Sequence, residues 1–347
     1  MKIGSFDLTS NKTFIIAELS ANHNGSLELA KESIKAAARA GADAIKLQTY
    51  RADTITLNSS NEEFIIKGTE LWDDQNLYSL YEKAYTPWEW HEELFEVAKR
   101  EGILCFSSPF DKSAVDFLEK LNPPAYKIAS FEITDYELIR YTASKGKPMI
   151  ISTGVATKEE IADAVAICRK EGNEEIILLQ CTSTYPAPLE DANLKMIPEL
   201  ARKFNVVSGF SDHTLGIVAP VVAVSLGAKV IEKHFMLDKS IPSADQAFSL
   251  DESEFKAMVD AVRQSEKLLG KVDYTLNEKR TYNRRFARSL YVSEPIKKGE
   301  LFTEQNIKSV RPANGIHPKH LRNILGKKAV CDLVFATPMK MEYVDEA

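Results

Sequence analysis

The chain has 347 residues, of which 44% are hydrophobic, and its formal net charge at pH 7 is −6. This length can bury a large core and exceeds that of one average domain, while the negative charge argues against partners such as nucleic acid or an anionic membrane surface. The N-terminus is too polar for a signal peptide, and no apolar run approaches the ~18 residues of a membrane span. We therefore expect a cytoplasmic protein with no membrane partner.

Short apolar runs recur eight times in the first 235 residues, and each is followed by an amphipathic or alanine-rich segment. The runs cover residues 13–18, 44–48, 103–108, 126–130, 148–152, 176–181, 206–213 and 229–234. Alternation of strand and helix repeated eight times is typical of a (β/α)8 TIM barrel, here predicted over residues 1–270. Nearly every run ends in a polar side chain, which is where barrel enzymes place their reactive groups.

Helix start signals support this pattern. Three segments have the sequence of a capping box, namely Thr86–Glu89, Thr157–Glu160 and Asp251–Glu254, and each is predicted to open a helix. The connection over residues 49–88 is much longer than the two to six residues usual in such folds. Long loops at this end of a barrel are commonly substrate lids. Its tyrosines could stack on a substrate, but we expect them mainly to pack the loop onto the barrel.

The pattern changes after residue 270. A charged stretch over residues 271–285 is predicted to be a linker. Residues 286–347 then combine short β-like runs with turn signals, which indicates a small, separate, mostly irregular domain.

Two histidines end adjacent predicted strands, His213 on the seventh and His234 on the eighth. Neighbouring strands lie about 4.8 Å apart, so two imidazoles at their ends can converge on one metal ion. Two histidines with oxygen ligands and open positions would suit a divalent cation such as Mn²⁺, although the sequence does not exclude Zn²⁺, Co²⁺ or Mg²⁺.

Two lysines, Lys46 and Lys127, are predicted to point into the barrel. A buried lysine is costly unless it is paired with an anion, so one interpretation is a structural salt bridge with Glu18 or Glu232. Serines end the neighbouring strands and suit phosphate or carboxylate oxygens; they are Ser108, Ser130, Ser152 and Ser183. Together these groups predict a small, multiply charged anionic substrate. A Schiff-base aldolase is the competing interpretation.

Several motifs together resemble the sialic acid synthase family, whose members condense phosphoenolpyruvate with an amino-sugar aldehyde. They are Ala17–Gly25, Ile45–Gln48, Tyr126–Ser130, Ser152–Gly154, Cys181–Pro186, Gly209–His213 and Ile231–Phe235. The C-terminal region resembles the antifreeze-like (SAF, β-clip type) domain of that family in the segments Arg288–Leu290, Lys297–Glu300 and Val310–Gly315. The resemblance covers essentially the whole chain.

Within the family, the sequence is most similar to the pseudaminic acid synthases. It departs from the usual sialic acid synthase pattern at Leu19–Ala21, at Ser183 in place of asparagine, at Met236 in place of threonine and at Pro242–Asp245. These departures favour a 6-deoxy, diacetamido sugar. The implied substrate is 2,4-diacetamido-2,4,6-trideoxy-L-altrose, with a sialic or legionaminic acid synthase as the alternative.

The resemblance also implies roles for individual residues. Lys127, Ser130, Ser152 and Ser183 would bind the phosphate, and Lys46 and Ser108 the carboxylate, of phosphoenolpyruvate. His213 and His234 would bind a divalent metal, with Mn²⁺ expected and Mg²⁺ or Co²⁺ as alternatives. Glu18, Gln48, Glu232 and Asp245 would be catalytic, and Glu132 and Tyr185 would contact substrate. In this family the SAF domain reaches the partner's barrel in a swapped homodimer, and Arg311 matches its substrate-contacting arginine.

A non-catalytic sugar-binding protein on the same scaffold is the rival from a different class. It predicts a degraded site in which the histidines or the lysines are missing. Both pairs and Glu18 are present, which favours an enzyme.

Overall fold

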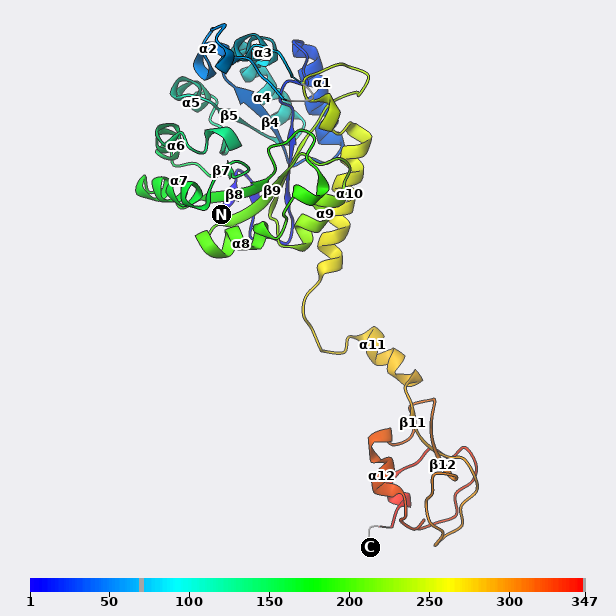
Figure 1. The fold of residues 1–347 in the computed structure, drawn as a ribbon. Helices are drawn as coiled ribbons and strands as arrows, with labels where there is room; N and C mark the ends of the chain where they lie inside the picture. The colour runs from blue at the N-terminus through cyan, green and yellow to red at the C-terminus, as the bar shows by residue number, and fades with distance from the viewer. Residues whose placement is uncertain (69–71, 346–347) are drawn as a thin grey trace. The chain divides into compact units, whose positions relative to one another are not determined.

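The computed structural model describes residues 1–68 and 72–345, and the chain divides into two compact units, Met1–Gly270 and Lys271–Ala347. The first unit is a closed barrel of eight parallel strands (Figure 1). The strands are β3 (Phe14–Glu18), β4 (Ala44–Thr49), β5 (Leu104–Pro109), β6 (Tyr126–Ile128), β7 (Met149–Ser152), β8 (Ile176–Cys181), β9 (Val207–Asp212) and β10 (Val230–His234). All eight predicted runs form barrel strands, and pairing of β10 with β3 closes the ring.

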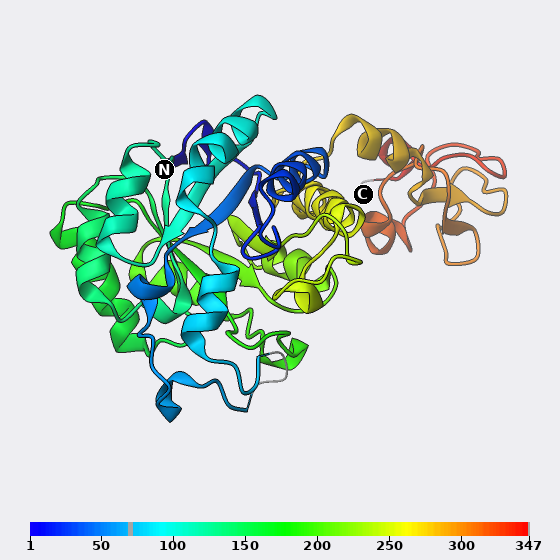
Figure 2. The same ribbon diagram turned by 90° about the horizontal axis from the view of Figure 1, so that it is seen from above.

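Helices surround the barrel strands, as Figure 2 shows in a view from above. They are α1 (Leu27–Arg39), α4 (His91–Arg100), α5 (Lys112–Glu119), α6 (Tyr136–Ala143), α7 (Lys158–Lys170), α8 (Met196–Phe204), α9 (Val218–Ser225) and α10 (Glu252–Leu269). The capping boxes predicted at Thr157 and Asp251 are confirmed, because each side chain accepts a hydrogen bond from the backbone of the first helical turn.

The capping box predicted at Thr86 is wrong. The chain there begins a 3₁₀ turn, η2 (Trp88–Trp90), with Pro87 at the N-cap and no side-chain cap. The Thr86 hydroxyl instead lies 3.2 Å from Nε2 of His23, and both residues are buried. A buried hydroxyl needs a partner, and the imidazole supplies one in place of the helix N-terminus.

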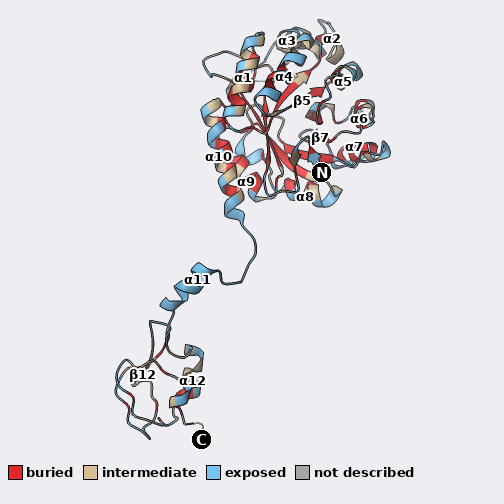
Figure 3. Ribbon diagram, turned by 180° about the vertical axis from the view of Figure 1, so that it is seen from behind, coloured by how far each residue is buried: buried red, intermediate tan, exposed pale blue. Residues whose placement is uncertain are grey.

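Side chains along each strand alternate between the helices and the barrel interior. Ile45 and Leu47 pack in the hydrophobic layer beneath the helices, whereas Lys46 points inward, as predicted. The half of the barrel interior nearer the N-terminal ends of the strands is apolar and includes Phe14, Ile16, Phe106 and Ile150. Nearly all residues of the barrel strands are buried, as Figure 3 shows in red.

A short N-terminal hairpin was not anticipated. It consists of β1 (Lys2–Ile3) and β2 (Phe6–Asp7), which pair antiparallel. Ile3 and Leu8 join the apolar cluster inside the barrel, so the hairpin region seals the N-terminal end of the strands. Polar side chains that project inward are thereby confined to the opposite, C-terminal end.

Residues 49–88, expected to form a long loop, contain short helices in their described part. These are α2 (Ala52–Ile55), η1 (Glu62–Phe64) and α3 (Leu77–Ala84). Asn76 caps α3 by accepting hydrogen bonds from the backbone amides of Tyr78 and Ser79.

The second unit contains α11 (Glu278–Asn283) and a two-stranded antiparallel sheet of β11 (Ser289–Val292) and β12 (Ile307–Val310), followed by α12 (Leu321–Ile324). It has its own buried cluster, which includes Leu290, Phe302 and Met339. Helix α11 lies within the stretch that we expected to be a linker. No helix among the described residues combines the length and the apolar composition needed to cross a membrane.

Candidate active site

A cavity of about 480 Å³ opens at the C-terminal ends of the barrel strands. It brings together twelve of the residues predicted from the sequence: Glu18, Lys46, Gln48, Lys127, Ser130, Glu132, Ser152, Tyr185, His213, Glu232, His234 and Asp245. They come from seven strands and from the loops that follow them. This convergence is the usual location of an active site in a barrel.

Two lysines and two glutamates form a buried ion cluster at the base of the cavity. Lys46 Nζ lies 2.9 Å from Glu232 Oε1 and 3.1 Å from Glu18 Oε2. Lys127 Nζ lies 3.8 Å from the same Glu232 oxygen. Burial acts to raise the pKa of Glu232, but the charges of Lys127 and Lys46 outweigh it and lower that pKa to about 2. In the unliganded protein the lysines are thus neutralised by carboxylates, as the salt-bridge interpretation expected.

The cluster is not fully satisfied. Glu232 Oε2 is buried and has no hydrogen-bond partner among the described residues, and Glu18 Oε2 contacts Lys46 only through the 3.1 Å ion pair. Burial raises the pKa of Glu18 despite the nearby Lys46. Burial also lowers the pKa of Lys127 to about 8, despite its contact with Glu232. A site with unpaired buried polar atoms and shifted pKa values is a typical ligand-binding centre.

Small hydroxyl side chains surround Gly154 beside this cluster. Ser130 Oγ accepts a hydrogen bond of 2.7 Å from the Gly154 amide, and the buried Ser152 hydroxyl has no hydrogen-bond partner in the part of the chain that the structure describes. A Cβ atom on Gly154 would collide with Ser183 Oγ, Cys181 Sγ and Ser130 Oγ. The glycine therefore keeps this part of the cavity open for an oxygen-rich group.

Two predicted serines lie just outside the cavity lining formed by the described residues. Ser183 is half-buried, with its hydroxyl 3.8 Å from Cys181 Sγ. Ser108 is buried, and no described residue hydrogen-bonds to its hydroxyl. Arg311 follows β12 in the second unit and is exposed.

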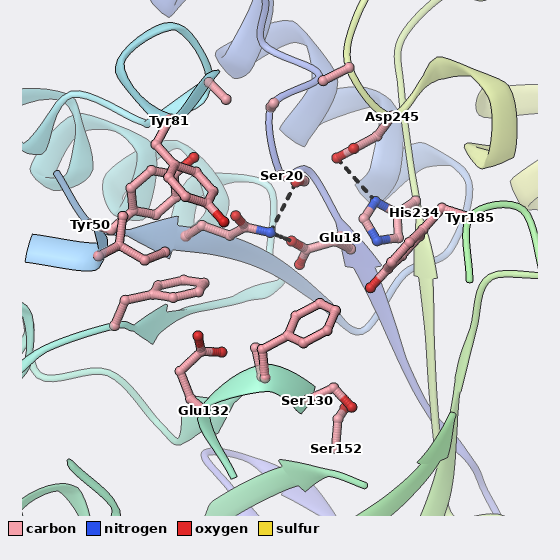
Figure 4. A pocket seen from close by; sticks show the side chains of 18 of the residues that line it. Glu18, Ser20, Tyr50, Tyr81, Ser130, Glu132, Ser152, Tyr185, His234 and Asp245 are labelled. Carbon is pink, nitrogen blue, oxygen red and sulfur yellow. Dashed lines mark hydrogen bonds and ion pairs between the residues drawn. The ribbon is translucent and has the colours of Figure 1, made fainter. Parts of the chain in front are cut away.

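The two predicted metal ligands lie side by side, with ring centroids 5.4 Å apart. Burial lowers the pKa of His213 to about 3, so its imidazole is neutral at physiological pH. Its Nδ1 lies 2.9 Å from the Thr182 carbonyl oxygen, an acceptor, which places the proton on Nδ1 and leaves a lone pair on Nε2. His234 Nδ1 lies 3.5 Å from Asp245 Oδ2 (Figure 4). Within residues 1–68 and 72–345, no three His, Cys, Asp or Glu side chains are grouped to hold a metal.

Polar groups that could contact a hydroxylated substrate line the same cavity. Gln48 Nε2 donates to Glu18 Oε1 and to Ser20 Oγ, each at 2.9 Å. Burial raises the pKa of Glu132 to about 7, and its Oε2 has no hydrogen-bond partner within residues 1–68 and 72–345. Burial acts to raise the pKa of Asp245, but contact with His234 holds it below the usual value.

One wall of the cavity is apolar, and it was not predicted from the sequence. The wall includes Tyr50, Ile55, Ile66, Trp72, Leu77, Leu80, Tyr81 and Ala84, all from the segment after β4. Of the loop tyrosines Tyr78, Tyr81 and Tyr85, which the sequence offered for contact with a substrate, Tyr81 lines the cavity. The spacing of Leu77, Leu80, Tyr81 and Ala84 is that of one helical face, which was the available signal.

Comparison with known proteins identifies the family. The model of the NeuB family matches residues 33–274, and that of the SAF domain matches residues 287–340. The chain belongs to the NeuB family. The resemblance to sialic acid synthases and the barrel-plus-SAF architecture are both confirmed.

Several NeuB family relatives align over nearly their whole length. A pseudaminic acid synthase of Campylobacter jejuni is 60% identical, covering 98% of this chain and 98% of the relative. A pseudaminic acid synthase of Helicobacter pylori is 51% identical, covering 96% and 98%. An N,N'-diacetyllegionaminic acid synthase of Campylobacter jejuni is 39% identical, covering 92% and 96%. Among solved structures, the spore coat polysaccharide biosynthesis protein spsE of Bacillus subtilis has a TM-score of 0.64 and 37% identity, covering 97% and 96%.

Proposed function

We propose that this chain synthesises pseudaminic acid, condensing phosphoenolpyruvate with 2,4-diacetamido-2,4,6-trideoxy-L-altrose and water, with release of phosphate. The enzyme is a transferase that forms a carbon–carbon bond. The observation that carries the proposal is a cavity that holds two buried lysines, a serine cradle and two histidines, in a chain 60% identical to a pseudaminic acid synthase. We further infer that it acts in the cytoplasm, where phosphoenolpyruvate is made.

Phosphoenolpyruvate fits the charged half of the cavity. Ser130 and Ser152, with Ser183 beside them, would hold the phosphate together with Lys127. Lys46 and the neighbouring Ser108 would hold the carboxylate. Each ammonium would exchange part of its contact with Glu18 or Glu232 for an anionic oxygen of the substrate, so the cluster is a preformed site for a multiply charged anion.

A divalent metal fits the two histidines, because His213 presents an unprotonated Nε2 and the contact of His234 Nδ1 with Asp245 leaves the other ring nitrogen of His234, Nε2, to bind a cation. Two nitrogens leave the remaining positions to oxygens of substrate and water, which suits Mn²⁺ and also Mg²⁺ or Co²⁺. When bound, such a cation would polarise the carbonyl of the open-chain aldehyde. Asp245 would orient His234.

In the reaction, C3 of phosphoenolpyruvate attacks the aldehyde carbon and forms the new carbon–carbon bond. Water then adds at C2, and the tetrahedral intermediate expels phosphate by cleavage of the bond between C2 and the bridging oxygen. Lys127 and the serines would stabilise the charge on the departing phosphate. Glu18, Gln48 and Glu232 would orient the sugar and manage protons, with Glu132 and Tyr185 contacting the substrate.

The second candidate is a synthase of legionaminic or sialic acid, because the same family contains both activities. The chain is more similar in sequence to the pseudaminic acid synthase than to the legionaminic acid synthase of Campylobacter jejuni, which favours synthesis of pseudaminic acid. Phosphate release from phosphoenolpyruvate, measured in parallel with the altrose derivative, its legionaminic counterpart and N-acetylmannosamine, decides between them. The proposal requires the highest kcat/KM with the altrose derivative and fails if another sugar exceeds it.

We also infer a homodimer in which the SAF domain of each subunit completes the partner's site. Arg311 would contact the substrate there. Its exposure on a turn-like segment and its match to the arginine of the family motif support this role.

A further inference from the structure

Helix α3 has an apolar face directed at the cavity. Its cavity-lining residues follow the i, i+3, i+4, i+7 spacing of one helical face, and they are Leu77, Leu80, Tyr81 and Ala84. Ser79, Glu82 and Lys83, on the other side of the helix, are exposed. Because α3 is amphipathic, its apolar side needs a partner that shields it from water.

That partner is not a hydrophobic core. The described residues form four hydrophobic clusters, and none of these includes an apolar side chain from the described residues between 51 and 89. The ring of Tyr81 meets that of Tyr50 edge-on at 5.6 Å, which ties the helix to the end of β4. The remaining apolar surface is half-buried and faces the cavity. An apolar patch of this kind at a concave site is typical of ligand binding.

The position of this wall determines which end of the sugar it contacts. Tyr50 and Tyr81 lie across the cavity from Tyr185 and His234 (Figure 4). Under the proposed function, the aldehyde end of the sugar lies at the histidines. The opposite end of the carbon chain, C6, then lies toward α3.

We propose that the apolar face of α3, together with Ile55 and Ile66, is the surface that selects a 6-deoxy sugar by contact with its C6 methyl group. This inference rests on the proposed function. Leu77, Leu80 and Ala84 carry no polar side-chain atom, so a C6 hydroxyl packed against these three side chains would lose water without gaining a hydrogen bond. A hydrophobic site discriminates against one added hydroxyl by about 10–100-fold.

The test compares two sugars in phosphate-release assays: 2,4-diacetamido-2,4,6-trideoxy-L-altrose and the same sugar with a hydroxyl at C6. The wild-type protein should prefer the 6-deoxy sugar by about 10–100-fold in kcat/KM. Leu80→Ser should reduce that preference about tenfold while the KM for phosphoenolpyruvate stays within about twofold. Leu57→Ser is the matched control, since Leu57 belongs to the same segment, is 68% exposed and does not line the cavity. The Leu57→Ser variant should keep the wild-type preference for the 6-deoxy sugar.

Ala84→Ser is a second variant that adds only one oxygen to the same face and so preserves the helix. It should raise kcat/KM for the 6-hydroxy sugar relative to the 6-deoxy sugar. The inference is overturned if the wild-type protein does not discriminate, or if both variants change the two sugars equally. If the wild-type protein uses neither sugar but accepts N-acetylmannosamine, the proposed function itself is overturned.

Discussion

Lys233 and Asp212 face each other on neighbouring strands, β10 and β9, with Nζ 2.6 Å from Oδ2 and neither side chain exposed. Lys233 also donates to the Thr214 carbonyl, and Asp212 accepts from the Thr214 amide. Each member of the pair precedes one of the two cavity histidines in sequence. The ion pair therefore links the ends of the two strands that carry His213 and His234.

Removing one member should leave a buried charge without a partner. We predict that Lys233→Met lowers the free energy of unfolding by about 3–5 kcal/mol in urea titrations. Lys256→Met breaks an exposed pair on α10 and is the control, with an expected change of about 0–0.5 kcal/mol. The double variant Asp212→Asn/Lys233→Met should be more stable than Lys233→Met alone. Equal effects of Lys233→Met and Lys256→Met would contradict a structural role for the pair.

The fold was largely predictable because it depends on local patterns. Eight apolar runs, each followed by an amphipathic or alanine-rich segment, identify the strands, and alternation within residues 44–48 and 126–130 identifies the inward side of Lys46 and Lys127. The sequence indicates that Lys46 points into the barrel but gives no distance from its ammonium to either carboxylate. It therefore left open whether Lys46 pairs with Glu18 or with Glu232. The structure shows contacts with both. The N-terminal hairpin escaped prediction because strands of two residues carry no periodicity.

The apolar cavity wall escaped prediction for a different reason. An amphipathic helix normally indicates a core contact, and we expected the tyrosines of residues 49–88 to pack on the barrel. In the structure the ring of Tyr81 does contact that of Tyr50. The face of α3 that carries Tyr81 and Leu80, however, lines the cavity. Spacing alone does not distinguish a helix that faces a core from one that faces a ligand.

Metal removal should abolish activity if the histidine pair holds a divalent cation. We predict that exhaustive chelation stops phosphate release and that added Mn²⁺ restores it. His213→Ala and His234→Ala should each lower kcat by orders of magnitude, and calorimetric titration should show weaker Mn²⁺ binding by the folded variants. His320→Ala, in the second unit, is the control. Full turnover by protein with negligible metal content would refute this role.

Binding of phosphoenolpyruvate should depend on the charge of Lys127. Burial lowers its pKa to about 8, so the ammonium is lost as the pH rises through that value. We predict that kcat/KM for phosphoenolpyruvate falls about tenfold per pH unit above pH 8. Lys127→Arg keeps its charge and should show a flatter profile at lower overall activity. If Lys127→Ala retained the wild-type profile in initial-rate measurements, another group would be responsible.

Stability should depend on the protonation of Glu132. Its pKa rises from 4.5 to about 7 on folding because the carboxyl is desolvated. Between these values the folded protein holds a proton that the unfolded chain releases, so this group's contribution to stability is complete below pH 4.5 and is lost as the pH rises through 7. We predict that Glu132→Gln stabilises the unliganded protein by about 1–3 kcal/mol at pH 8 and has little effect at pH 4.5.

Urea unfolding at the two pH values measures this difference directly. Glu190→Gln is the matched control, because Glu190 is exposed and the change should have similar small effects at both pH values. A Glu132→Gln variant that is no more stable than wild type at pH 8 would contradict a destabilising, desolvated carboxylate at this position.

Subunit mixing tests whether Arg311 acts in the partner's site. Lys127→Ala removes a cavity lysine from the barrel, and Arg311→Ala removes the guanidinium from the SAF domain, so each variant alone should have little activity. After subunit exchange, a swapped heterodimer contains one site with both residues intact. We predict that mixing restores phosphate release, approaching one active site per heterodimer. Mixing wild type with Lys127→Ala calibrates the exchange, which native mass spectrometry quantifies. Complete exchange without recovery would mean that Arg311 serves its own chain or has no catalytic role.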